Sequence, residues 1–129
     1  MKRILVTGAT GFVGSNLIRY LADKGVEIDA LVRSDNPAEG AAKSFTWEQL
    51  GEIDFGEIDS IIHLAGKAHD VRNVSDESEY FEINVELTDK LARRACSSGF
   101  SGQFIHFSSV KAVADHVVAV LDEDASPDP

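Results

Sequence analysis

Three glycines near the start of the chain, Gly8, Gly11 and Gly14, have the three-residue spacing of a phosphate-binding turn. The first would let the chain turn tightly, the second would leave no side chain between the backbone and a pyrophosphate, and the third would let a following helix pack closely on a sheet. The N–H groups and partial positive charge at the N-terminus of that helix would attract phosphates. The pattern therefore predicts a dinucleotide site, and a tight strand-to-helix turn without a ligand is the alternative. We assign these residues of the turn to the site: Gly8, Thr10, Gly11, Phe12, Val13 and Gly14.

A strand before the glycines and a helix after them would hold this turn in place. An apolar run at residues 4–6 precedes the turn, and Val13, Leu17 and Leu21 follow it at the four-residue spacing of one helix face. We therefore expect a strand, the glycine turn, and then a helix from Phe12 to Asp23.

Strand and helix patterns alternate along the rest of the chain. Further strands are predicted over residues 26–32, 43–47, 59–64 and 103–107. A second long helix should begin near Asp76, with Glu79 as its capping-box partner, and should end at Gly99. The segment 38–57 has little pattern apart from its strand and a helical turn at 47–50.

This alternation predicts the fold class. We expect an α/β protein with a Rossmann-like, doubly wound parallel sheet in the strand order 3-2-1-4-5. Residues 1–129 should form one NAD(P)-binding domain. A sheet of this type normally continues past its fifth strand, so we expect the chain to be the N-terminal fragment of a longer protein.

The composition restricts the partners and the compartment. The 129 residues carry a formal net charge of −10, which leaves no basic surface for nucleic acid. Cys96 is the only cysteine, so no intrachain disulfide can form and a reducing compartment is favoured. The apolar run at residues 4–6 is too short for a signal peptide or a membrane span. We therefore expect a cytoplasmic protein that binds neither nucleic acid nor membranes.

Four stretches of the chain resemble one enzyme family. They are the TGxxGxxG pattern at Thr7–Gly14, the HLAA-like strand end at His63–Gly66, Asn84 in a predicted helix, and the strand end Phe107–Lys111 with its serines. In this order and spacing they resemble the N-terminal half of extended short-chain dehydrogenases/reductases, within the NAD(P)-dependent nucleotide-sugar epimerase/dehydratase group. The Ser-Ser-Val-Lys form, together with Ala68-His69, is most similar to UDP-sugar epimerases and 4-ketoreductases.

The resemblance implies hydride transfer at a sugar carbon, with a nucleotide-sugar as substrate and NAD or NADP as cofactor. In that family a tyrosinate takes the hydroxyl proton, a lysine lowers the pKa of this tyrosine, and a serine hydrogen-bonds the reacting oxygen. The motif assigns the serine role to Ser109 rather than Ser108, and the alternative is that both serines only satisfy backbone groups at a strand end. The resemblance also implies cofactor contacts at Leu64, Ala65, Gly66 and Asn84, and substrate contacts at Lys67 and His69.

The tyrosine and lysine of the family lie in a Tyr-x-x-x-Lys helix that would come after Pro129. The stretch Tyr20–Lys24 has the same spacing, but it lies in the first predicted helix, where we expect Tyr20 to be partly buried helix surface. The chain as given is therefore expected to be inactive as an enzyme. A non-catalytic dinucleotide sensor is the alternative function, and a Tyr-x-x-x-Lys pair downstream would distinguish the two.

Arg33 and Ser34 follow the second predicted strand, where NAD-preferring proteins of this fold carry an acidic residue. An arginine there could pair with a 2′-phosphate, so we expect NADP in preference to NAD. The alternative is a solvated Arg33, with Asp35 serving the ribose of NAD. Trp47 is expected either to cover the adenine or to lie in the core.

Two further expectations concern the histidines and the last strand. His63 and His106 have apolar neighbours in their strands and lack the ligand spacing of a metal site, so we expect core or strand-end histidines and no metal. The outer edge of the strand at 103–107 would carry unpaired backbone groups, which predicts self-association through that edge or poor solubility.

Overall fold

The computed structural model describes residues 1–67, 77–114, 116–118 and 120–127. Its centre is one sheet of five parallel strands: β1 (Arg3–Thr7), β2 (Glu27–Val32), β3 (Lys43–Thr46), β4 (Ser60–His63) and β5 (Gln103–His106). The strand order is β3-β2-β1-β4-β5. The Rossmann-like parallel sheet and its predicted strand order are therefore confirmed.

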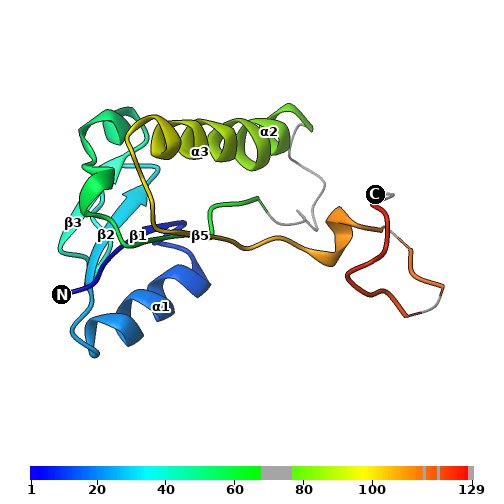
Figure 1. Ribbon diagram of the computed structural model, residues 1–129, viewed down its shortest axis with the longest axis horizontal. Helices are drawn as coiled ribbons and strands as arrows, with labels where there is room; N and C mark the ends of the chain where they lie inside the picture. Colours follow the sequence, from blue (N-terminus) through cyan, green and yellow to red (C-terminus); the bar gives the residue numbers. More distant parts are fainter. Residues whose placement is uncertain (68–76, 115, 119, 128–129) are drawn as a thin grey trace.

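Helices cover both faces of this sheet (Figure 1). One face carries α1 (Phe12–Ala22), and the other carries α2 (Glu77–Phe81) and α3 (Leu87–Ser97), which are joined by the π-helical segment η3 (Glu82–Glu86). Three short 3₁₀ helices complete the described elements: η1 (Glu48–Glu52), η2 (Phe55–Glu57) and η4 (Val110–Ala112). After β5 the chain leads away from the sheet (Figure 1).

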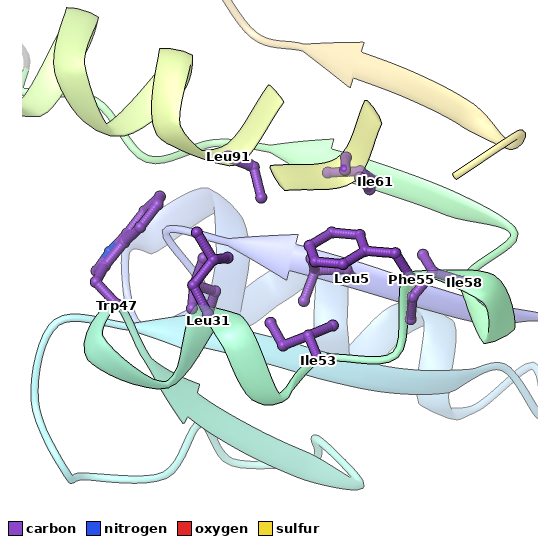
Figure 2. Packing of buried hydrophobic residues seen from close by; sticks show 10 residues of the cluster. Leu5, Leu31, Trp47, Ile53, Phe55, Ile58, Ile61 and Leu91 are labelled. Atoms are coloured by element: carbon purple, nitrogen blue, oxygen red, sulfur yellow. The ribbon is translucent and has the colours of Figure 1, made fainter. Parts of the chain in front are cut away.

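Two hydrophobic cores lie on the two faces because side chains alternate along each strand. On β1, Leu5 packs into the core under α3, whereas the next residue, Val6, packs into the core under α1. On β2, Ile28, Ala30 and Val32 lie on one side of the strand and share the α1 core. Figure 2 shows the α3 core, whose labelled members are Leu5, Leu31, Trp47, Ile53, Phe55, Ile58, Ile61 and Leu91.

The segment between β3 and β4 contributes more to the core than its sequence pattern indicates. Leu50 and Phe55 lie on η1 and η2 and are buried against the sheet, as is Ile53 between them. Each 3₁₀ helix is too short to show a helical period in the sequence, so the segment looked unpatterned.

The second long helix differs from the prediction in one respect. It is continuous in sequence, but η3 interrupts the α-helical turns between α2 and α3. The predicted cap at Asp76 lies outside the described residues. Within the described part of the chain, no helix is both long and apolar enough to cross a bilayer.

Among the described residues β5 pairs with β4 and forms one edge of the sheet. Self-association through this edge stays a prediction.

Candidate functional site

A cleft of about 420 Å³ opens at the carboxyl ends of β1, β2 and β4. Neighbouring strands β1 and β4 leave the sheet towards helices on opposite faces, so the cleft lies at the switch point where ligands bind in open parallel sheets. Its volume is within the range of about 300–1,000 Å³ that is usual for ligand pockets. Eight residues that the sequence assigned to a cofactor or substrate line it: Gly8, Thr10, Gly11, Arg33, Leu64, Ala65, Gly66 and Lys67.

The glycine turn forms the floor of this cleft. Gly8 has a φ of +64°, and a Cβ there would lie 2.7 Å from the carbonyl carbon of Leu64, so only glycine fits this close approach. A Cβ on Gly14 would lie 2.2 Å from the carbonyl oxygen of Gly8. Gly14 therefore lets α1 pack against the turn itself, rather than against the sheet as expected from sequence.

The N-terminus of α1 is open to the cleft. Gly11 is the N-cap, and no side chain of the described residues caps the helix. The first backbone N–H that bonds back into the helix is that of Ser15, which donates to the Gly11 carbonyl at 2.9 Å. The N–H groups of residues 12–14 are the donors that a helix N-terminus offers to an anion, whereas the Gly11 N–H already donates to the Gly8 carbonyl at 3.0 Å.

Five predicted site residues do not line the cleft: Phe12, Val13, Gly14, Asn84 and Ser109. Phe12 and Val13 are exposed on the first turn of α1, with 86% and 51% of their surfaces accessible. His69 lies outside the described residues. The roles of all these residues as ligand contacts stay predictions.

The cleft also has an apolar wall that sequence reasoning largely missed. It consists of Leu31, Val32, Trp47, Ile83 and Leu87. The alternative that Trp47 lies in the core is confirmed, since it is only 7% exposed and belongs to the α3 core. Trp47 also lines the cleft, and its contact with an adenine stays a prediction. Ile83 and Leu87 lie four residues apart in the second helical region, and nothing in a helical period tells which of its members face an opening.

Lys67 and Asn84 form a clasp at the mouth of the cleft. The Lys67 N–H donates to Asn84 Oδ1 at 2.7 Å, and Asn84 Nδ2 donates to the Lys67 carbonyl at 3.2 Å. The Lys67 ammonium pairs with Glu79 at 2.5 Å and lies 5.1 Å from the centre of the Tyr80 ring. Asn84 thus bonds the backbone of Lys67 from an exposed position on η3.

His63 connects this region to the end of β1. The two strands place Thr7 beside His63 in register, and Thr7 Oγ1 lies 2.6 Å from His63 Nδ1. His63 Nε2 lies 2.8 Å from the hydroxyl of Thr88 on α3. Because the ring is fully buried, and secondarily because His106 is near, the pKa of His63 is lowered from 6.5 to about 4. The prediction of a core histidine is confirmed for His63, and His106 stacks on it as an exposed strand-end residue.

Ser109 lies after β5, outside the cleft lining. Its hydroxyl caps η4 by accepting a hydrogen bond from the Lys111 N–H at 3.2 Å, which is the backbone-satisfying role weighed as the alternative. Tyr20 is 60% exposed on α1, which corrects the expectation of partial burial. Its ring contacts the ammonium of Lys24, 4.6 Å from the ring centre. Among the described residues, no group of three His, Cys, Asp or Glu side chains could hold a metal ion.

Comparison with known proteins finds relatives of this chain among dehydrogenases and epimerases. A 3-beta-hydroxysteroid dehydrogenase of Mycolicibacterium neoaurum is 32% identical over 125 residues, which cover 88% of this chain and 33% of that protein. The UDP-glucose 4-epimerase of Neisseria meningitidis serogroup C is 30% identical over 144 residues, which cover 98% of this chain and 42% of that protein. The chain thus spans only about a third to two fifths of the length of these relatives.

A solved structure is also similar to this chain in fold and sequence. MoeE5, in complex with UDP-glucuronic acid and NAD, superposes with a TM-score of 0.78 at 27% identity, over 98% of this chain and 43% of that one. The sequence model of the NAD dependent epimerase/dehydratase family matches residues 4–129. Since this match includes nearly the whole chain, the protein belongs to the NAD-dependent epimerase/dehydratase family.

Proposed function

We propose that the chain is the NAD(P)-binding part of an enzyme that epimerises or reduces a nucleotide-sugar, with a UDP-sugar as the substrate class. The observation that carries the proposal is the cleft at the switch point of the sheet, with the glycine turn as its floor. Dinucleotides bind in this crevice in folds of this type.

The residues of the cleft fit a dinucleotide. The glycine turn and the uncapped N-terminus of α1 would hold the pyrophosphate, because they offer backbone donors and no side chain in the way. Arg33 and Trp47 would hold the adenosine end, and the backbone of Leu64–Gly66 would line the opposite side. When bound, the cofactor supplies the hydride acceptor.

The substrate class rests on the relatives. The epimerase from Neisseria is aligned over 98% of this chain, and MoeE5 is described with a UDP-sugar bound. Ser109 would hydrogen-bond the reacting oxygen of the sugar, and Lys67 and His69 would contact the substrate. The steroid dehydrogenase is the competing class, so substrate turnover is the measurement that decides between them.

Cofactor binding by the chain itself is the first test. We expect NADPH or NADH fluorescence to change on mixing, and Thr10→Glu to weaken binding at least about 10-fold, because it places a carboxylate in the phosphate region of the cleft. Ala22→Glu adds the same charge at the exposed end of α1 and is the matched control. If the wild-type chain binds neither dinucleotide, or Thr10→Glu binds as tightly as Ala22→Glu, the proposed site is wrong.

The substrate is tested on a protein that carries this domain together with a Tyr-x-x-x-Lys helix. We expect turnover with UDP-glucose or UDP-N-acetylglucosamine and none with a 3β-hydroxysteroid. Ser109→Ala should reduce kcat by about 10²-fold, within the range of about 10²–10⁴ for loss of a proton-transfer or hydrogen-bonding partner. Turnover of the steroid alone would overturn the substrate assignment.

A further inference from the structure

The hydrogen bonds around His63 have one direction that follows from their donors and acceptors. The carbonyl oxygen of Asn84 can only accept, so the Thr88 hydroxyl uses its single proton on it, at 3.0 Å. Thr88 Oγ1 must then accept from His63, whose Nε2 is 2.8 Å away and therefore carries the proton.

The other half of the chain of bonds follows from the neutrality of His63. A neutral imidazole with its proton on Nε2 has a bare Nδ1, so the Thr7 hydroxyl donates to it across 2.6 Å. Thr7 Oγ1 keeps a lone pair, which accepts the N–H of Ala65 at 3.1 Å. The bonds thus run one way, from the Ala65 N–H through Thr7, His63 and Thr88 to the Asn84 carbonyl.

Both ends of this series of hydrogen bonds lie next to the cleft. Ala65 lines the cleft, and its nitrogen would lie 2.8 Å from a Cβ on Gly8, so its position sets how closely the β4 end approaches the glycine turn. Asn84 holds the backbone of Lys67, two residues after Ala65, from the side of the helix. The segment 65–67 is therefore held at both of its ends by groups that His63 connects.

We propose that His63 is a positioning residue for the dinucleotide site, because it joins the cleft-lining backbone at Ala65 to the helical segment that carries Asn84. This inference rests on the proposed function, since it assumes that the cleft binds a dinucleotide. His63 itself does not line the cleft, and it acts through Thr7 and Thr88. Thr88 was not singled out from the sequence, because its contact with His63 joins residues 25 apart.

The test uses substitutions at Thr88, which lies outside the cleft lining. Thr88→Val keeps the shape of the side chain but removes the hydroxyl, and Thr88→Ser restores it. We expect Thr88→Val to weaken NADH or NADPH binding by about 2- to 10-fold, which is the usual worth of one hydrogen bond, and Thr88→Ser to bind within about 2-fold of wild type. Hydrogen exchange at the Lys67 and Ala65 amides should be faster in Thr88→Val.

A variant with a small cavity in the core separates the effect of positioning on binding from the effect of a general loss of stability. Ile28→Val trims a residue of the α1 core that is 1% exposed and lies outside the cleft lining, so it should reduce stability and leave binding unchanged. Nitrogen-15 spectra of His63 should show a protonated Nε2 and a bare Nδ1. A protonated Nδ1 in the neutral ring would overturn the proposed direction.

The outcomes distinguish this inference from the proposed function. If the wild-type chain binds neither NADH nor NADPH, the proposed function fails and the inference fails with it. If the wild-type chain binds, but Thr88→Val binds equally well or no worse than Ile28→Val, only the inference fails. Weaker binding in Thr88→Val that Thr88→Ser rescues supports it.

Discussion

Thr7 and His63 lie side by side at the carboxyl ends of β1 and β4, with 2.6 Å between the hydroxyl oxygen of one and Nδ1 of the other. Both are the last residues of their strands, and both are fully buried. A buried polar pair of this kind is stable only while each group keeps its partner. The charge state of His63 should therefore affect the stability of the whole domain.

We expect the domain to lose stability as the pH falls from about 7 to 5. The pKa of His63 is about 4 in the folded protein, whereas an unfolded histidine titrates near 6.5. In that window the unfolded chain binds a proton that the folded chain does not, so the free energy of unfolding falls by about 2 kcal/mol. The loss is complete below the folded pKa. Urea unfolding at several pH values measures it.

Two variants isolate the contribution of His63. His63→Asn should make the free energy of unfolding depend less on pH between pH 7 and pH 5. His116→Gln, at an exposed position, should leave this pH dependence as in the wild type. An equal pH dependence of unfolding in wild type and His63→Asn would show that His63 does not cause the loss of stability.

Gly14→Ala should destabilise the domain. In most helices alanine is about 1 kcal/mol better than glycine, but here the added Cβ would lie 2.2 Å from the Gly8 carbonyl oxygen and 2.8 Å from Ala9 Cα. Backbone atoms cannot move aside cheaply, so we expect a net loss of about 1–3 kcal/mol. Gly51→Ala, where a Cβ meets nothing within 4 Å, is the control and should be neutral or slightly stabilising. Equal denaturation midpoints for the two variants would refute this.

Arg33→Ala should reduce the preference for NADPH over NADH. Arg33 lines the cleft and is exposed, and a charge-assisted pair with the 2′-phosphate would be worth about 1.5–3 kcal/mol, or about 10- to 100-fold. Glu48, Glu79 and Glu82 line the adjoining hollow together with Arg33, so the lower end of that range is expected. The ratio of the two dissociation constants measures this, with Arg19→Ala as the control on α1. A ratio that Arg33→Ala leaves unchanged would rule out the NADP preference.

Dinucleotide binding should quench the fluorescence of Trp47. It is the only tryptophan of the chain and it lines the cleft, so a bound nicotinamide dinucleotide in the reduced form would accept its excitation energy. Titration with NADH or NADPH measures the effect, and Trp47→Phe should abolish it. Binding detected by another method without quenching would place the dinucleotide elsewhere.

Asn84→Ala should loosen the segment after β4. The substitution removes both hydrogen bonds to the Lys67 backbone, and because Asn84 is exposed, the loss of stability should stay at or below about 1 kcal/mol per bond. We expect faster hydrogen exchange at the Lys67 amide and weaker dinucleotide binding. Glu86→Ala, an exposed position in the same π-helical segment, is the control. Identical exchange in the two variants would show that the clasp does not order this segment.

The sequence by itself determined the sheet, the glycine turn and the family. Periodicities of two and of 3.6 residues predict strands and helices, and glycine is required wherever a Cβ would collide, so Gly8 and Gly14 already marked the turn. Of the site residues assigned from the sequence, the eight that line the cleft come from this turn and from the ends of the strands.

Only the tertiary structure decided which side chains meet there. The alternation of side chains along β1 and β4 follows from the sequence. The 2.6 Å contact of Thr7 with His63, however, depends on the register between two strands whose paired residues are 56 positions apart. Thr88 reaches His63 only because α3 packs on that face, and Trp47 lines the cleft because the pairing of β3 with β2 brings the residue after β3 to the carboxyl end of the sheet. A local pattern carries no information about such contacts, since they arise from the packing of elements distant in sequence.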